Sequence, residues 1–286
     1  TASLNHSRHI KSMGPDPKEV EQINAYLVPG LNVIVEAVSR PPAHKAPMVW
    51  GNKPSDGGNL ILSVSEATEA IAHEPFVSDF IFDFVGSQEF VKGVVRRCLW
   101  IEDLDVEKAE SSAFITSRLA AVRAMRSASD AVSTQEYAQK PHRFRQIQGR
   151  ANRFSVVVPK VTSESRPYLP VGILSAHTIV SDNAFALYDA PIWNMAVIAS
   201  RLHMVWVKTV CGQLETRLRY SNTMGWNAFP IPMLTDKNKA DLARCAEDIL
   251  LAREAYYPAT IAEMYDPERI DTEFPRVRAA HEANDR

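Results

Sequence analysis

Apolar and polar residues alternate most regularly over residues 214–221. One set of alternate positions is mostly apolar and consists of Leu214, Thr216, Leu218 and Tyr220. The other set is polar and consists of Glu215, Arg217, Arg219 and Ser221. A period of two is typical of a strand that rests one face on a core and leaves the other face free. The pattern therefore predicts an exposed polar strand face at this point of the chain.

The polar face of this predicted strand admits two interpretations. Arginine can donate two hydrogen bonds to guanine O6 and N7, and glutamate can accept one from cytosine N4. The face could therefore read bases in a DNA groove. A row of glutamate and arginine is also typical of a solvated surface with ion pairs between neighbouring strands. Alternation alone leaves both interpretations open.

The remaining pattern predicts an α+β protein, in which a domain with a mixed, twisted β-sheet precedes a small helical domain. Apolar spacing and capping residues predict helices over 17–25, 65–74, 106–126, 191–210, 236–256 and from 274 onward. Runs of β-branched and apolar residues predict strands over 31–38, 94–101, 154–159, 168–174 and 178–188. Three parts follow: residues 1–19 as a linker or the edge of an upstream domain, 20–230 as the sheet domain, and 231–286 as the helical domain.

Charge is unevenly distributed along the 286 residues, whose formal net charge is -2. Residues 113–162 carry nine basic and two acidic side chains, a net charge of +7, whereas residues 233–286 carry eight basic and twelve acidic ones, a net charge of -4. DNA binding needs a local basic patch and is compatible with a small overall charge. The basic stretch predicts phosphate contacts, although a solvated basic surface would have the same composition.

Three segments supply candidate phosphate-binding residues. The turn-rich loop 48–65 places Asn52 and Lys53 near its tip, where its glycines either bring backbone N–H groups to a phosphate or simply satisfy turn geometry. The polar loop 134–153, which we expect to be exposed, contributes Arg143 and Arg145. A third segment follows the strand at 154–159 and combines a hydroxyl with two cations: Lys160, Ser163 and Arg166.

The sequence lacks the motifs of the common catalytic sites. It contains no Asn- or Asp-Pro-Pro-aromatic motif for a flipped adenine, no glycine-rich nucleotide loop, and no H-E-x-x-H or G-x-S-x-G motif. Three widely separated cysteines exclude a CxxC zinc cluster and favour free thiols in a reducing cytoplasm. No apolar run reaches the roughly 18 residues of a membrane span. We therefore expect a cytoplasmic protein without metal, membrane contact or catalysis by this chain alone.

Several short stretches resemble, in the same order, the MmeI-like family of single-chain type II restriction–modification enzymes and adenine-specific DNA methyltransferases. The most specific is Gly-Gln-Leu-Glu-Thr-Arg-Leu-Arg-Tyr-Ser at 212–221, followed by Trp-Asn-Ala-Phe-Pro-Ile-Pro at 226–232. The other stretches lie at 23–27, 51–60, 97–100, 159–166 and 203–206. The resemblance extends over residues 20–286, nearly the whole chain.

The resemblance implies that residues 20–230 form a target-recognition domain for double-stranded DNA. It also implies that four residues read individual base pairs: Asn183, Glu215, Arg217 and Arg219. Asparagine can bond adenine N6 and N7 together, although a lone asparagine near the start of a strand is often a turn residue. In the family the methyltransferase and nuclease domains lie upstream, so S-adenosylmethionine is expected there and no cofactor in this chain. A protein-interaction or dimerisation module without DNA contact is the alternative.

Overall fold

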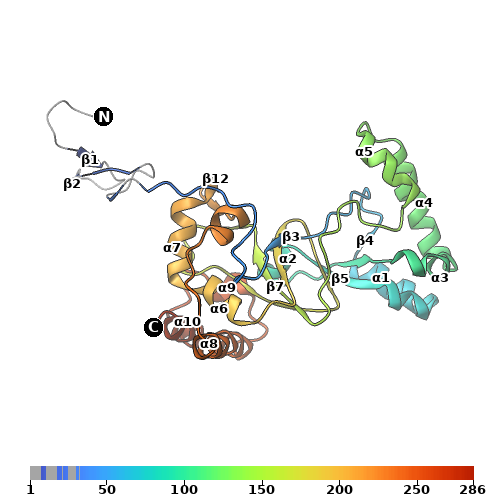
Figure 1. Cartoon of the computed structure of the whole chain (residues 1–286). Coiled ribbons are helices and arrows are strands. Elements are labelled where there is room, and N and C mark those ends of the chain that lie inside the picture. Colours follow the sequence, from blue (N-terminus) through green and yellow to red (C-terminus); the bar gives the residue numbers. More distant parts are fainter. Residues whose placement is uncertain (1–7, 11–17, 21, 25–29, 32) are drawn as a thin grey trace.

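The computed structural model describes residues 8–10, 18–20, 22–24, 30–31 and 33–286. Over these residues the chain forms four sheets, joined by helices and long turns (Figure 1). Strands β1 (Arg8–Ile10) and β2 (Lys18–Val20) pair antiparallel as a separate two-stranded sheet. The predicted helix over 17–25 is therefore wrong at 18–20, where the backbone pairs as a strand, and residues 22–24 are not helical either.

The first four-stranded sheet has the order β10-β5-β6-β4. Its strands are β4 (Ile61–Leu62), β5 (Ile81–Val85), β6 (Arg97–Leu99) and β10 (Thr178–Val180). Three helices supply the apolar side chains that pack against it, namely α1 (Val64–His73), α3 (Val106–Glu110) and α4 (Ala113–Ser127). Leu62, Phe84 and Val122 are buried in the resulting core, which is one of two large cores in the described part of the chain.

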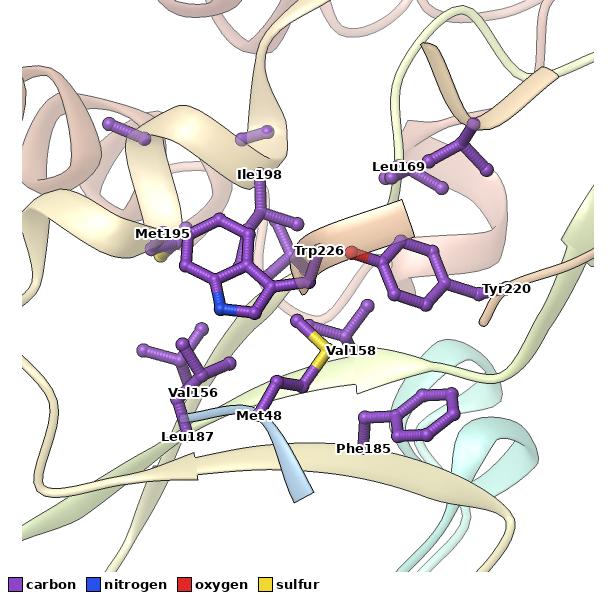
Figure 2. Close-up of a cluster of buried hydrophobic side chains, with 14 of the residues drawn as sticks. Met48, Val156, Val158, Leu169, Phe185, Leu187, Met195, Ile198, Tyr220 and Trp226 are labelled. Carbon is purple, nitrogen blue, oxygen red and sulfur yellow. The ribbon is translucent and has the colours of Figure 1, made fainter. Parts of the chain in front are cut away.

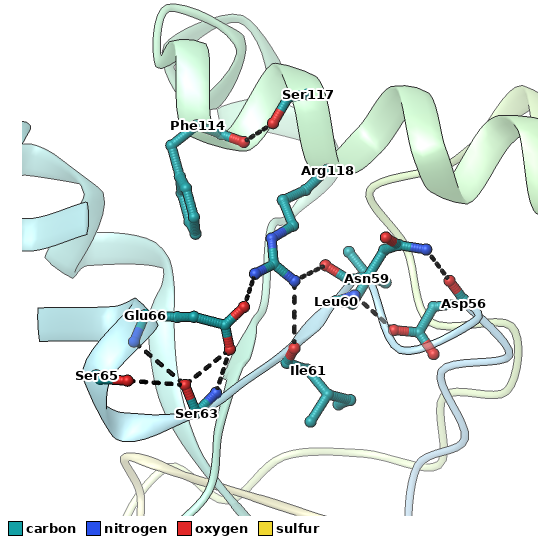
Figure 3. A network of polar contacts seen from close by, with 10 residues as sticks. All are labelled: Asp56, Asn59, Leu60, Ile61, Ser63, Ser65, Glu66, Phe114, Ser117 and Arg118. Carbon is teal, nitrogen blue, oxygen red and sulfur yellow. Dashed lines mark hydrogen bonds and ion pairs between the residues drawn. The ribbon is translucent and has the colours of Figure 1, made fainter. Parts of the chain in front are cut away.

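A capping box fixes the turn from β4 into α1 (Figure 3). The Ser63 hydroxyl accepts from the Glu66 N–H at 3.2 Å, and the Glu66 carboxylate accepts from the Ser63 N–H at 2.8 Å. Arg118 of α4 forms an ion pair with Glu66 and donates to the carbonyl oxygen of Asn59 at 3.4 Å. The predicted helix over 65–74 is thus confirmed, and the ion pair between Glu66 and Arg118 joins its first turn to α4.

The second four-stranded sheet has the order β3-β11-β7-β9, and all neighbouring strands in it are antiparallel. Its strands are β3 (Val49–Trp50), β7 (Phe154–Pro159), β9 (Gly172–Ser175) and β11 (Ala184–Tyr188). The core on this sheet also takes side chains from α6 (Trp193–Ala199), α7 (Arg201–Val210) and α8 (Asp236–Glu254). Figure 2 shows this core, in which the Trp226 ring lies among Met48, Met195 and Ile198.

The third sheet has three strands in the order β12-β13-β8, with β8 at Val161–Ser163, β12 at Gly212–Leu214 and β13 at Arg217–Arg219. The C-terminal part is helical, with α9 (Ile261–Met264) and α10 (Pro275–Asn284) following α8. Shorter helical turns are Pro75–Phe80, α2 (Ser87–Lys92), Asp103–Asp105, α5 (Val132–Gln135), Glu136–Gln139 and the π-helix Asn222–Asn227. The α+β class with a helical part after the sheets is confirmed.

Two predicted long helices are each divided in two at a serine. In the predicted helix 106–126, Ser112 caps α4, and its hydroxyl accepts from the Ile115 N–H at 3.2 Å. In the predicted helix 191–210, Ser200 caps α7, and its hydroxyl accepts from the His203 N–H at 3.1 Å. A serine at such a position satisfies free backbone donors and so starts a new helix.

Two further segments differ from the predictions. Residues 33–38 form no strand, and Leu31, Val33 and Ile34 are exposed. The loop 134–153 is exposed only in part: Phe144 is buried and stacks edge-on against Phe84 and Trp100, whereas Gln146 and Arg150 are exposed as predicted.

Candidate nucleic-acid interface

Residues 214–221 form part of a hairpin rather than one strand. β12 pairs antiparallel with β13 through Leu214 and Arg217, so Glu215 and Thr216 make the turn between them. Glu215 has a φ of 58°, in the left-handed region, which reverses the chain. The predicted alternation survives from Arg217 to Tyr220, where Leu218 and Tyr220 are buried and Arg217 and Arg219 are exposed. Glu215 is therefore presented by the turn and the two arginines by the strand.

Glu215 and Arg217 still act as one polar group. Their side chains form an ion pair with an Nη2–Oε2 distance of 2.7 Å, and the side chains are 75% and 49% exposed. An exposed pair of this kind contributes at most about 1 kcal/mol to stability, so its groups can be redirected to a ligand at little cost. The pair offers an acceptor beside a bidentate donor, which is what the major-groove edge of a C·G base pair requires.

The strand that carries these arginines is held in place by a buried tyrosine that follows it. Tyr220, directly after β13, is buried, and its hydroxyl lies 2.9 Å from Nε2 of His203 on α7. Burial raises the pKa of Tyr220 well above its usual value and lowers the pKa of His203 to about 3, so both groups stay neutral at pH 7. β13 also pairs with β8, placing Arg217 opposite Ser163. Arg217 therefore projects from a strand that is paired on one side with β8 and is followed by a buried, hydrogen-bonded tyrosine.

Next to β13 lies an open cavity of about 590 Å³. It gathers residues from separate parts of the chain, and five of them were predicted as DNA contacts from the sequence: Lys160, Ser163, Arg166, Asn183 and Arg217. The other wall is formed by α2 and by Arg96. The fold thus brings three of the phosphate candidates together with two of the base-reading candidates.

Asn183 is both a turn residue and a member of this cavity. Its backbone N–H donates to the Ser181 hydroxyl at 3.3 Å in the turn between β10 and β11. Its carbonyl oxygen accepts from the Ser87 hydroxyl of α2. Among the described residues, no side chain hydrogen-bonds to the Asn183 amide group, which remains available to a ligand in the cavity.

The cavity is strongly positive. Five cationic side chains line it against the single carboxylate of Glu89: Lys92, Arg96, Lys160, Arg166 and Arg217. Glu89 is already engaged by Arg96 at 2.9 Å. Burial lowers the pKa of the Arg166 guanidinium, which donates to the Thr162 hydroxyl at 2.8 Å. Partly buried cations that outnumber nearby carboxylates are suited to phosphate oxygens or to base acceptors.

Two further cations, Arg219 and Lys53, lie near Lys160 at the edge of the cavity. The Lys160 ammonium lies 3.9 Å from the centre of the Trp50 ring, and the Trp50 side chain is itself exposed. Burial, then the charge of Arg219, and to a smaller extent that of Lys53, lower the pKa of Lys160, while Asp182 opposes them. Arg219 and Lys53, both predicted contacts, therefore lie within electrostatic reach of Lys160.

The structure corrects the prediction for Asn52. It is fully buried rather than at a loop tip, and its amide group donates to the carbonyl oxygens of Gly149 at 2.9 Å and Val180 at 3.2 Å. Its side-chain oxygen accepts from the Gln148 N–H at 2.8 Å. Asn52 therefore holds loop 146–149 in place and has no group left for a phosphate.

Arg143 and Arg145 lie outside the cavity, in the partly exposed loop 134–153. Arg143 forms an ion pair with Asp103 at 3.0 Å, and Arg145 donates to the Ser133 hydroxyl at 2.7 Å. Arg126 of α4 is buried and donates to five carbonyl oxygens, including those of Lys140 and Arg143. Phosphate contact by Arg143 and Arg145 stays a prediction.

Comparison with known proteins identifies the family of this chain. The family model of the MmeI target recognition domain matches residues 29–233. The chain belongs to the MmeI target recognition domain family. A curated relative, DNA methyltransferase A of Bacillus subtilis (strain 168), is 37% identical over 268 residues. That match covers 94% of this chain but 30% of the relative.

A solved structure agrees with this family assignment. The type IIL restriction–modification enzyme MmeI in complex with DNA superposes with a TM-score of 0.87 at 28% sequence identity. The superposition covers 98% of this chain and 37% of MmeI. This MmeI-family chain therefore spans about a third of the length of each of these two proteins.

Sequence reasoning missed the α2 wall of the cavity in this target recognition domain. Gln88, Lys92 and Arg96 line it, and none of them lies in a segment that alternation or charge singled out. One signal was available: Gly86 followed three residues later by Glu89 has the form of a helix start, and the Glu89 carboxylate accepts from the Gly86 N–H at 3.0 Å. Within the described residues, no helix is long and apolar enough to span a membrane, and no cluster of three potential metal ligands occurs.

Proposed function

We propose that this chain selects a short sequence in double-stranded DNA by reading base edges with Asn183, Glu215, Arg217 and Arg219. The observation that carries the proposal is the cavity beside β13. There, Asn183 and Arg217 meet Lys160, Ser163 and Arg166, although these residues come from three separate segments of the chain. Base-edge donors flanked by phosphate-binding groups are the combination that sequence-specific recognition needs.

The role proposed for each residue follows from the chemistry of its side chain. Glu215 and Arg217 read one base pair together, Arg219 and Asn183 read neighbouring ones, and Lys53, Lys160, Ser163 and Arg166 hold the backbone. The similarity to MmeI, solved in complex with DNA, supports this assignment, as does membership of a family named for target recognition.

We further propose that the chain serves an associated DNA-methylating domain. Its curated relative is named as a DNA methyltransferase and is more than three times as long as the matched region. The methyl donor, S-adenosylmethionine, would then be bound by an upstream methyltransferase domain and not by this chain. An upstream nuclease domain, action in the cytoplasm and the absence of any membrane partner belong to the same proposal.

The proposal is tested by selection from a random duplex library with this chain at ~50 mM salt, since phosphate contacts weaken steeply as salt rises. Enrichment of a motif of several base pairs is the expected result. Binding without any enriched motif would place specificity outside this chain and overturn the proposal.

One observation favours a second candidate, a protein-interaction module. An apolar pocket of about 320 Å³ is lined by Val205 and Leu202 of α7, which are 56% and 71% exposed, and by Phe229. If this module bound only protein, the chain would show no duplex affinity at low salt and a solution mass above that of a single copy.

A further inference from the structure

The wall of the cavity opposite β13 carries polar groups that the proposed base readers leave unexplained. Along the six residues of α2, Ser87, Gln88, Glu89, Val91 and Lys92 all line the cavity. The inference drawn from them rests on the proposed DNA recognition and adds a residue to it.

The position of α2 is fixed relative to the predicted DNA contacts by a shared serine. The Ser87 hydroxyl donates to the carbonyl oxygen of Asn183 and accepts from the backbone N–H of Lys160 at 2.9 Å. Before it, Gly86 lies close to both residues: a Cβ there would lie 3.3 Å from the Cβ of Asn183 and 2.9 Å from the Glu89 carboxylate. The helix also packs against β5 and β7 (Figure 1). These contacts therefore fix the position of the Gln88 backbone relative to Asn183 and Lys160.

Two side chains on this wall, those of Glu89 and Val91, are not available to a ligand. Glu89 accepts from Arg96 and from the Gly86 N–H, and Val91 is buried. The Gln88 amide is exposed, and no described residue hydrogen-bonds to it. Lys92 is exposed and forms no ion pair within the described chain. A free amide and a free ammonium thus face the same cavity as Arg217 and Asn183.

The chemistry of the two groups separates their roles. A glutamine amide carries a donor and an acceptor that match N6 and N7 of adenine together, as an asparagine does, whereas a lysine is a single point charge suited to a phosphate. We propose that Gln88 is a further specificity-determining residue, which reads an adenine in a base pair next to the one read by Arg217. Lys92 neutralises the phosphate beside it.

The proposal is tested by duplex selection with the full chain and two variants, Gln88→Ala and Gln88→Glu. The Ala variant is expected to lose adenine preference at one position by about five-fold or more while keeping the rest of the motif. The Glu variant, an acceptor only, is expected to shift that same position toward cytosine. Gln139→Ala, at an exposed glutamine away from the cavity, is the matched control and should leave the motif unchanged.

The outcomes separate this inference from the proposed function. If the unsubstituted chain enriches a motif and both Gln88 variants enrich the same one, Gln88 reads no base and only this inference fails. If the unsubstituted chain binds duplexes without enrichment, the proposed recognition itself fails, and the role of Gln88 falls with it. Circular dichroism of each variant confirms that a changed motif does not arise from lost folding.

Discussion

Arg217 belongs to the hairpin, to the ion pair and to the lining of the cavity. It is exposed, it pairs with Glu215 across the hairpin turn, it lies opposite Ser163 in the strand pairing, and it lines the cavity. Its neighbours in sequence have simpler surroundings: Leu218 is buried, and Arg219 points out near Lys160. Adjacent residues can thus have opposite roles, as do the buried Asn52 and the exposed Lys53.

Lys160 gives the residue-scale prediction. Lys160→Gln removes one cation from the proposed phosphate contacts, so affinity for all duplex sequences should fall, and the slope of log K against log[salt] should become shallower by about one. Fluorescence anisotropy across a salt series measures both quantities. Lys237→Gln, on the exposed face of α8, is the control and should leave the slope unchanged. An unaltered slope in Lys160→Gln would remove this residue from the interface.

At the scale of elements, the sequence predicts best what is decided locally. β7 has the predicted bounds, 154–159, because its β-branched residues Val156, Val157 and Val158 favour a buried strand, and α8 follows from regular spacing within one segment. The hairpin at 212–219 was missed because its reversal depends on the positive φ of Glu215, a residue type that rarely adopts it. The cavity was missed as a unit because α2 and Arg96, which form one wall, lie 64 to 130 residues away in sequence from the residues of the other wall.

The capping box of α1 gives the element-scale prediction. Hydrogen bonds from Ser63, with a further contribution from Arg118, lower the pKa of Glu66 to about 2. A depressed carboxyl pKa stabilises the fold above the unfolded-state value near 4.5, and this stability is lost as the pH falls toward 2. Glu66→Gln should therefore be less stable than the unsubstituted chain at pH 7, and the difference should shrink below pH 4.5.

Urea unfolding between pH 3 and pH 7 measures this difference. Glu69→Gln is the matched control, because Glu69 lies on the same helix and is exposed. Its stability should track that of the unsubstituted chain at every pH. A Glu66→Gln deficit that stays constant across the range would show that the carboxylate charge of Glu66 contributes nothing to the cap.

At the scale of the whole molecule, the helical C-terminal part is built into the second sheet. Ala246 and Ile249 of α8 lie in the same buried cluster as Val156 of β7. Arg253, also buried, donates to the carbonyl oxygen of Val171 at 2.7 Å and to the hydroxyl of Tyr265 at 2.8 Å. These contacts predict that residues 231–286 unfold together with the sheet that supports the cavity, although the sequence suggested a separate domain.

Arg253→Met tests this cooperativity. The change leaves two buried oxygens without a donor, which should lower the free energy of unfolding by about 1–3 kcal/mol. All five tryptophans lie before residue 231, so their fluorescence reports on the sheets, whereas circular dichroism includes the C-terminal helices. Both midpoints should fall together, and Arg244→Met, at an exposed pair on α8, should change neither. A shift in circular dichroism alone would mean that the C-terminal part unfolds independently.

The central claim is that the hairpin bearing Glu215 and Arg217 reads bases. Its most direct test is duplex selection with a charge-exchanged variant that combines Glu215→Arg with Arg217→Glu, compared with the unsubstituted chain under the same conditions. Because the exchange reverses the order of donor and acceptor while keeping the net charge, the preferred base pair should change at one position, with little loss of overall affinity. An unchanged motif would contradict the account, because the hairpin would then lie outside the base-reading surface.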